Sequence, residues 1–176
     1  LLSKLGTSLA YDTRGGGLLP NKGQRTELSA VLAGGPVGGD HSFYKLEAHT
    51  AWYFKGFAPG HVLEVLGRAG VAQAYGNSQD VPCYERYYLG GLYSMRCFEY
   101  RSVSPREDNI GEPIGGDTFW FGSAEYSLPV FDQGHGISVR FALFYDIGNV
   151  ELQPYHFDLS NFDETWGVGL RMNLPI

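Results

Sequence analysis

Histidine, cysteine and carboxylate side chains are the groups in this sequence that could bind a metal or carry out acid–base chemistry. The histidines are scattered and include no His-Glu-x-x-His pair, the arrangement that holds zinc on a helix. Cys83 and Cys97 are too few for a disulfide scaffold and lack metal-ligand spacing. Carboxylates such as Asp12 and Glu27 are better explained as the lining of a polar surface than as an acid–base pair. We therefore expect no metal and no cofactor.

Nucleophilic and phosphate-binding motifs are also missing from the sequence. There is no Gly-x-Ser-x-Gly elbow and no Walker loop. The glycine-rich run 34–39 resembles a phosphate cradle only superficially, because no helix follows it, and a hairpin loop is the better interpretation. The formal net charge of −6 and the singly spread lysines and arginines argue against a nucleic-acid partner. We expect a protein that is not an enzyme.

The elements that would position these side chains show strict alternation of apolar and polar residues. In 43–54, Leu46, Trp52 and Phe54 fall on one face, while Lys45 and Glu47 fall on the other. A period of two is the pattern of a β-strand with one apolar face. The same split recurs in six further segments, which gives seven predicted strands: 4–12, 25–32, 43–54, 62–75, 118–128, 137–150 and 165–174.

Two all-β architectures fit this pattern, a soluble β-sandwich and an outer-membrane β-barrel. Strands of about ten residues, tilted by ~45°, span about 23 Å, which matches the apolar band of an outer-membrane barrel. Sandwich strands are usually shorter. The polar face also carries glycines and aromatic residues, as a crowded lumen would, and Trp and Tyr gather near strand ends. These features favour an antiparallel meander forming part of a membrane barrel over a soluble β-sandwich binding module.

The connections alternate between short and long. Tight turns are predicted at 55–60 and 130–136, and a mid-length turn at 13–23. Longer loops are predicted at 33–41 and 151–163, and the longest covers 76–116. Short turns on one side and long loops on the other are typical of outer-membrane barrels, whose long loops are extracellular.

The longest loop carries a recognisable motif. The run from Tyr84 to Gly91 reads Tyr-Glu-Arg-Tyr-Tyr-Leu-Gly-Gly, and it is followed by Met95-Arg96-Cys97-Phe98. Flanking matches include Ser123-Ala124-Glu125-Tyr126 and Phe144-Tyr145-Asp146-Ile147-Gly148. In order and spacing, these motifs resemble the barrel domain of the BamA-type outer-membrane assembly factors along essentially the whole chain, and the loop resembles their sixth extracellular loop.

The resemblance implies a sixteen-stranded barrel, preceded by periplasmic POTRA repeats, of which residues 1–176 would supply strands eight to fourteen. It also implies that loop 76–116 folds into the lumen, where Arg96 pairs with Glu125 and Asp146. Both carboxylates do fall on the polar faces of neighbouring predicted strands. An arginine fork can bridge two carboxylates in a partly desolvated lumen. The alternative is a solvated Arg96 above carboxylates that merely line a wet pore.

One residue departs from the family pattern. The family motif has glycine where this chain has Cys97. We hypothesise that Cys83 and Cys97 form a disulfide that restores order to the loop, in a compartment that permits such bonds. Two unpaired thiols are the alternative.

The function implied by the resemblance is the folding and insertion of nascent β-barrel proteins in the bacterial outer membrane. Its partners would be those nascent proteins, outer-membrane lipid and accessory assembly lipoproteins. A two-partner secretion pore, a TamA-like factor and a patatin-fused member share the loop motif and stay open as alternatives. Seven strands would leave two open edges that lipid cannot satisfy, so we expect further strands on both sides of a truncated domain.

Overall fold

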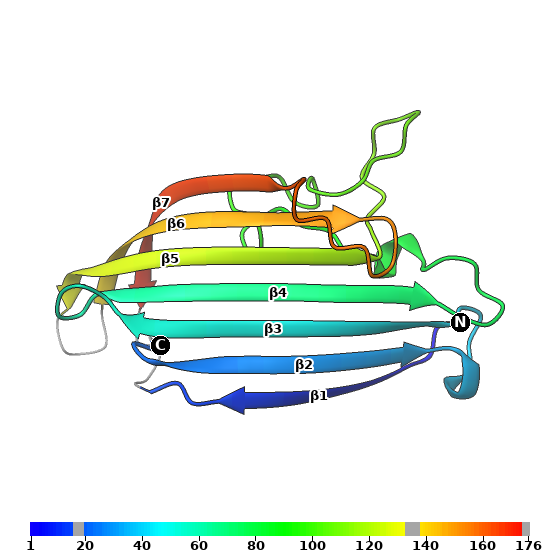
Figure 1. The fold of residues 1–176 in the computed structure, drawn as a ribbon, viewed down its shortest axis with the longest axis horizontal. Helices are drawn as coiled ribbons and strands as arrows, with labels where there is room; N and C mark the ends of the chain where they lie inside the picture. Colours follow the sequence, from blue (N-terminus) through cyan, green and yellow to red (C-terminus); the bar gives the residue numbers. More distant parts are fainter. Residues whose placement is uncertain (16–19, 133–137, 174–176) are drawn as a thin grey trace.

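The seven predicted strands form one antiparallel sheet in this computed structural model, which describes residues 1–15, 20–132 and 138–173 (Figure 1). The strands are β1 (Lys4–Asp12), β2 (Gly23–Ala33), β3 (Phe43–Lys55), β4 (Val62–Ala74), β5 (Thr118–Asp132), β6 (Ser138–Glu151) and β7 (Asp163–Asn173). They follow one another in the order β1-β2-β3-β4-β5-β6-β7, so each strand pairs with its sequence neighbours. The predicted meander is confirmed.

Strand β5 extends further than its alternation predicts. It continues to Asp132, with a shift in register against β6 between Pro129 and Phe131. Proline has no N–H to donate to the neighbouring strand, and a bulge is where a sheet tolerates it. The expected turn at 130–136 is therefore wrong at its start, and residues 133–136 lie outside the described part of the chain. So does Leu174, the last residue of the predicted seventh strand.

The outer face of the sheet carries large apolar side chains that no second layer covers. Leu46 is 46% exposed and Val65 is 40% exposed, although a sandwich would bury both residues between two sheets. Exposure is similar or greater at Leu9, Leu28, Trp166, Val168, Leu170 and Met172. Exposed apolar residues on every strand form the surface expected of a barrel wall in contact with hydrocarbon.

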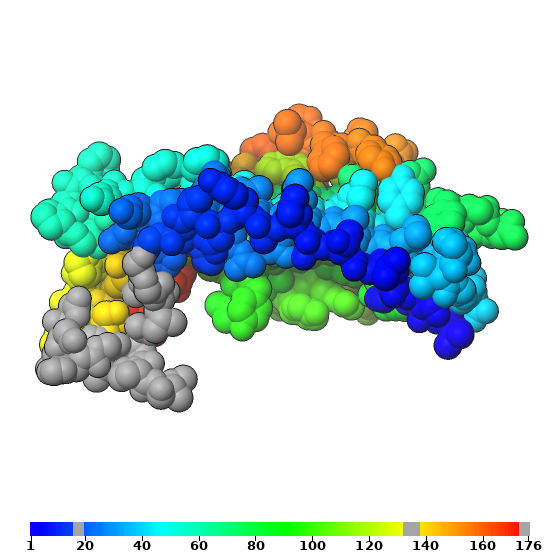
Figure 2. Space-filling view, turned by 90° about the horizontal axis from the view of Figure 1, so that it is seen from below, coloured from blue at the N-terminus to red at the C-terminus, as the bar shows by residue number. Residues whose placement is uncertain are grey.

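The inner face is covered by the loop that joins β4 to β5, and together they form the apolar core. Phe43, Phe119 and Phe121 point from the sheet into this core, where they meet Leu89 and Met95 of the loop. Figure 2 shows the loop (green) bulging from one face of the curved sheet, opposite the β6–β7 connection (orange). The inner wall thus contributes apolar side chains to this core.

The two ends of the sheet carry different connections. The β1–β2 and β3–β4 connections lie at one end, which we call the turn end, and the β2–β3, β4–β5 and β6–β7 connections lie at the other, which we call the loop end (Figure 1). The run 34–39 belongs to the β2–β3 hairpin loop, as its sequence predicted, and it contains the 3-10 turn Gly35–Val37. Within the described residues there is no helix long and apolar enough to cross a membrane.

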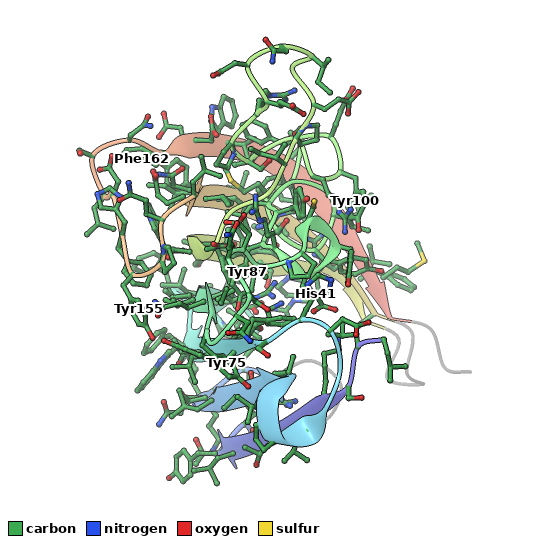
Figure 3. The ribbon with its side chains drawn as sticks, turned by 90° about the vertical axis from the view of Figure 1, so that its right-hand side faces the viewer. His41, Tyr75, Tyr87, Tyr100, Tyr155 and Phe162 are labelled. Atoms are coloured by element: carbon green, nitrogen blue, oxygen red, sulfur yellow. The ribbon has the colours of Figure 1, made fainter. Side chains whose placement is uncertain are left out.

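The β6–β7 loop folds back over the outer face at the loop end. Its Tyr155 hydroxyl lies 2.7 Å from the hydroxyl of Tyr44 on β3, and the Trp120 indole donates a hydrogen bond of 2.9 Å to the carbonyl of Asp158. Figure 3 shows Tyr155 and Phe162 on this side of the sheet, away from Tyr87 in the inner loop. Aromatic residues with polar tips suit a water–membrane interface.

Candidate loop-anchoring site

The β4–β5 loop is folded on itself by short β-bridges between its own residues. Leu89 and Val103 exchange two backbone hydrogen bonds of 3.0 and 3.1 Å, which close a hairpin inside the loop. Gly90 begins the turn region with φ = 107°, and a Cβ at this position would lie 2.3 Å from the carbonyl oxygen of Glu99. Glycine is needed there because any side chain would clash with the returning backbone. The hairpin presents Met95, Arg96 and Phe98 to the wall.

Arg96 reaches the β6 carboxylate of Asp146 in three ways. Its backbone N–H donates to Asp146 Oδ2 at 3.1 Å, its Nε donates to the same oxygen at 2.8 Å, and its Nη2 donates to Oδ1 at 2.6 Å. The Asp146 side chain is fully buried, and the Arg96 side chain is 14% exposed. Two parallel N–H donors on one carboxylate form the strong, directional pairing that a guanidinium fork allows. The structure therefore brings these two predicted residues together.

Glu125 on β5 completes the predicted set of partners. Arg96 Nη1 donates to Glu125 Oε2, and Arg96 Nη2 also donates to the Ser123 hydroxyl at 2.9 Å. Ser123 in turn donates to Asp146 Oδ1 at 2.7 Å, as expected of residues that are register partners across β5 and β6. One loop arginine is thus bonded to two adjacent strands.

Arg171 on β7 is a further member of the site that the motif did not point to. Its Nε and Nη2 donate to the two oxygens of Glu125 at 3.1 and 2.6 Å. Alternation places Arg171 on the polar face, but the strand sequence does not say which carboxylate it meets, because Glu125 lies two strands away. Two guanidinium groups therefore share Glu125, and the anchor spans β5, β6 and β7.

The aromatic ring of Phe144 contacts the Arg96 guanidinium. Its Cζ atom lies 3.8 Å from the centre of the Phe144 ring, a cation–π distance. Phe144 lies opposite Gly167 on β7, where a Cβ would lie 2.7 Å from the ring. Glycine at 167 therefore leaves room for the ring that contacts the guanidinium.

The site is suited to holding a loop in place. Arg96 and Arg171 balance Glu125 and Asp146 in charge, and the N–H groups of Arg96 find acceptors on two strands. Such a network is strongly destabilised when one member is removed, because the remaining buried charge is left without its partner. Among the described residues, no group of three histidines, cysteines or carboxylates is placed to hold a metal ion.

The rest of the motif serves the same anchoring. Met95 is fully buried in the apolar core, and Phe98 packs against that core. Cys97 adopts φ = 70°, the left-handed conformation that glycine takes at no steric cost. Cys83 and Cys97 are both exposed and free in this structure, so the hypothesised disulfide is not formed here.

The base of the loop, next to β5, contains an acidic residue away from the anchor. Burial raises the pKa of Asp117 to about 6, Arg86 opposes this effect, and Asp80 adds to it. Arg86 Nε lies 3.6 Å from Asp117 Oδ1, which has no hydrogen-bond partner among the described residues. The Asp117 backbone bonds to β4 and β6 through Ala72 and Glu151. Protonation of Asp117 would therefore remove a buried charge where the loop joins the sheet.

The loop also contacts the opposite edge of the sheet. Lys4 Nζ on β1 donates to Glu85 Oε1 at 2.6 Å. The loop thus has ionic contacts with β1 on one side and, through Arg96 and Glu125, with β5 to β7 on the other. The β4–β5 loop therefore crosses the concave face from one edge of the sheet to the other, and we call it the brace.

Known proteins resemble the chain in sequence. Residues 1–176 match the Omp85 superfamily domain. An outer membrane protein assembly factor BamA of Nitratidesulfovibrio vulgaris is 37% identical over 129 residues, which are 73% of this chain and 16% of that protein. BamA of Neisseria meningitidis is 32% identical over 76% of this chain and 17% of its own length. The SAM50-like protein of Drosophila melanogaster is 29% identical over 99% of this chain and 38% of its length.

A solved structure confirms the fold. The crystal structure of BamA from Haemophilus ducreyi lacking POTRA domains 1–3 superposes with a TM-score of 0.77, at 22% identity, over 95% of this chain and 35% of that one. The chain therefore spans a small part of each bacterial relative, and it has the fold of a segment of the barrel. The match to the superfamily domain over all 176 residues shows that the chain belongs to the Omp85 superfamily.

Proposed function

We propose that this chain is part of a barrel that assembles β-barrel proteins in an outer membrane. The observation that carries the proposal is the identity of 37% and 32% to two outer membrane protein assembly factors across about three quarters of the chain. The likeness of the sheet to the barrel of a third such factor supports it. The animal relatives are named sorting and assembly machinery components, so the source of the membrane stays open, and a bacterial outer membrane remains our prediction.

The two faces of the sheet support a position in the bilayer. Exposed leucines and tryptophans would meet lipid, while Glu125 and Asp146 on the other face bind the brace. Each unpaired backbone N–H or C=O group at the free edges of β1 and β7 would cost roughly several kcal/mol of free energy in hydrocarbon. We infer that additional strands close the barrel, so that lipid and nascent barrel proteins are its partners. Accessory lipoproteins remain a prediction from the resemblance.

The anchored loop would act without catalysing a covalent reaction. Assembly of a client strand requires unpaired edges elsewhere in the barrel, because main-chain hydrogen bonds give such pairing its affinity. A barrel that opens at one edge needs a rigid opposite wall. In this proposal, the loop and its arginine hold the curvature of β1 to β7 while the rest of the barrel moves.

Reconstitution of the intact protein in lipid vesicles tests the function. A urea-unfolded outer-membrane barrel protein is added, and its folded fraction is followed by the gel shift between folded and unfolded forms. Vesicles with the protein should fold the client several times faster than vesicles with an unrelated barrel of equal size. Equal rates would refute the proposal. The Asp12→Asn variant, altered at an exposed ion pair with Arg14 outside the anchor, should match the parent protein.

A further inference from the structure

A cavity lies between the loop hairpin and the inner wall, close to the anchor. Its volume is about 270 Å³, and three arginines contribute to its lining: Arg68 of β4, and Arg86 and Arg101 of the loop. Four tyrosines and Phe119 supply most of the remaining side-chain surface, and no carboxylate lines it. This concentration of positive charge stands out in a chain whose formal net charge is −6.

Arg68 lies on the inner face of β4 without an acidic partner. It is the register partner of His49, and its Cζ atom lies 5.8 Å from the ring centre of Phe119. Arg14, Arg25, Arg96 and Arg171 each pair with a carboxylate, whereas Arg68 forms no ion pair in the part of the chain that the structure describes. The nearby Glu47 is already close to Lys45, at 3.8 Å. A half-buried guanidinium without an anion is costly unless something else supplies one.

Arg101 is held in place by aromatic rings. Its Cζ atom lies 4.4 Å from the ring centre of Tyr88 and 5.4 Å from that of Tyr100, and its backbone has φ = 64°. Stacking on rings leaves the N–H edge of a guanidinium free to donate, and here too no ion pair forms with a described residue. Figure 3 shows Tyr87 close to the sheet and Tyr100 farther out in the loop. The Tyr87 hydroxyl is buried and lacks a hydrogen-bond partner among the described residues.

Arg86 is only partly satisfied by its neighbours. Its Nε donates to the carbonyl of Val81 at 3.0 Å, and its nearest approach to the Asp117 carboxylate is 3.6 Å. The cavity therefore offers two unpaired guanidinium groups and a third with donors to spare. Arginine forks bind planar oxyanions well, and aromatic walls accommodate the apolar part of a side chain or an adjacent ring.

We propose that this arginine–tyrosine pocket binds a carboxylate side chain of a polypeptide segment that enters the lumen. The pocket lies on the inner face, under the loop, so a lipid headgroup on the outer face does not reach it. The identification of the segment as part of a nascent client rests on the proposed function. The same chemistry could come from a carboxylate elsewhere in the intact protein, and the experiment separates the two sources.

Binding of a defined peptide to the intact protein tests the pocket. The probe is a fluorescent peptide with alternating Asp or Glu and aromatic residues, and its matched control carries Asn and Gln in place of the acids. We expect the acidic peptide to bind and the neutral one to bind at least tenfold more weakly. Arg68→Gln and Arg101→Gln should each weaken binding of the acidic peptide about tenfold. Arg25→Gln removes the same charge from the same face outside the pocket and should leave binding within about twofold.

A photo-crosslinker at Tyr93, an exposed lining residue, identifies the occupant. Crosslinking to the acidic peptide or to an added client supports the pocket as a client site. A crosslink within the protein itself, with no peptide binding, overturns the proposal, because a carboxylate of the protein then fills the site. Equal binding of the acidic and neutral peptides also overturns it. Client folding in vesicles is measured on the same preparations, so a failed pocket with intact folding leaves the proposed function standing.

Discussion

Asp146→Asn is the substitution that most sharply tests the loop anchor. The parent carboxylate is fully buried and accepts three hydrogen bonds from Arg96 and one from Ser123. Asparagine keeps the size of the side chain but offers one oxygen and no charge, so the paired donation from Arg96 is lost. Removing one member of a buried ion pair costs about 3–5 kcal/mol. We take the lower end, about 3 kcal/mol, because Arg96 keeps Glu125.

The backbone amide of Arg96 reports on this loss directly, since it donates to the carboxylate itself. A loss of about 3 kcal/mol corresponds to roughly 150-fold faster hydrogen exchange if local opening limits exchange. Hydrogen–deuterium exchange with mass spectrometry on the intact protein in nanodiscs measures it in the peptide that contains Met95 to Phe98. Ser123→Ala removes the hydroxyl's hydrogen bonds to Arg96 and Asp146 but leaves the ion pairs of Arg96 in place, and it should accelerate exchange about tenfold.

The matched control is Asp12→Asn, which makes the same chemical change at an exposed pair with Arg14. It should leave exchange at Arg96 within about twofold, because exposed pairs contribute little to stability. If Asp146→Asn also leaves the exchange unchanged, the carboxylate does not anchor the loop. An equal acceleration in both variants would point to general loosening of the sheet and would refute the reasoning as well.

Three further predictions follow from the loop and its neighbours. Cys97→Gly should stabilise the protein by about 0.5–1 kcal/mol, since relief of the left-handed strain outweighs the entropy of glycine; a lower urea midpoint in detergent would contradict this. Arg171→Gln, at a side chain that is 39% exposed, should speed exchange at Arg96 only about fivefold, and an effect as large as that of Asp146→Asn would reverse our ranking of the partners. Asp117 has a folded-state pKa of about 6, above its ordinary value of 3.8. The stability of the loop base, measured as the protection of its backbone amides from hydrogen exchange, should therefore be greatest below pH 4 and fall as the pH rises to about 6. Asp117→Asn should abolish this pH dependence, and persistence of the dependence would assign it to another group.

Alternation along the chain is sufficient to predict the strands, because each side of a barrel wall meets a different solvent. The residues 43–54 show this well, since Leu46 and Trp52 stay exposed on the outer face while Phe43 is buried on the inner one. The end of β5 was less predictable. Pro129 and Val130 look like a turn in sequence, but a bulge lets the strand continue past them.

The site was predictable as far as it depends on a motif. Arg96, Glu125 and Asp146 fall in matching family segments, and the structure places them in contact. Arg171 was not predictable as a partner, because its pairing with Glu125 depends on how far β7 is tilted and shifted relative to β5. The free state of Cys83 and Cys97 was equally beyond the sequence, since spacing along a loop does not fix how close two side chains come.

The orientation of the two faces is the central claim, and spin labels along β3 test it most directly. Single cysteines are placed at positions 45 to 52 of the intact protein in lipid, in a background where Cys83→Ser and Cys97→Gly remove the native thiols. We predict that oxygen accessibility alternates with period two, with maxima at Leu46, Ala48, Thr50 and Trp52, and that labels at Lys45, Glu47 and His49 are shielded from oxygen. Alternation of the opposite phase, or high accessibility to a water-soluble nickel reagent at Leu46 and Ala48, would contradict the account.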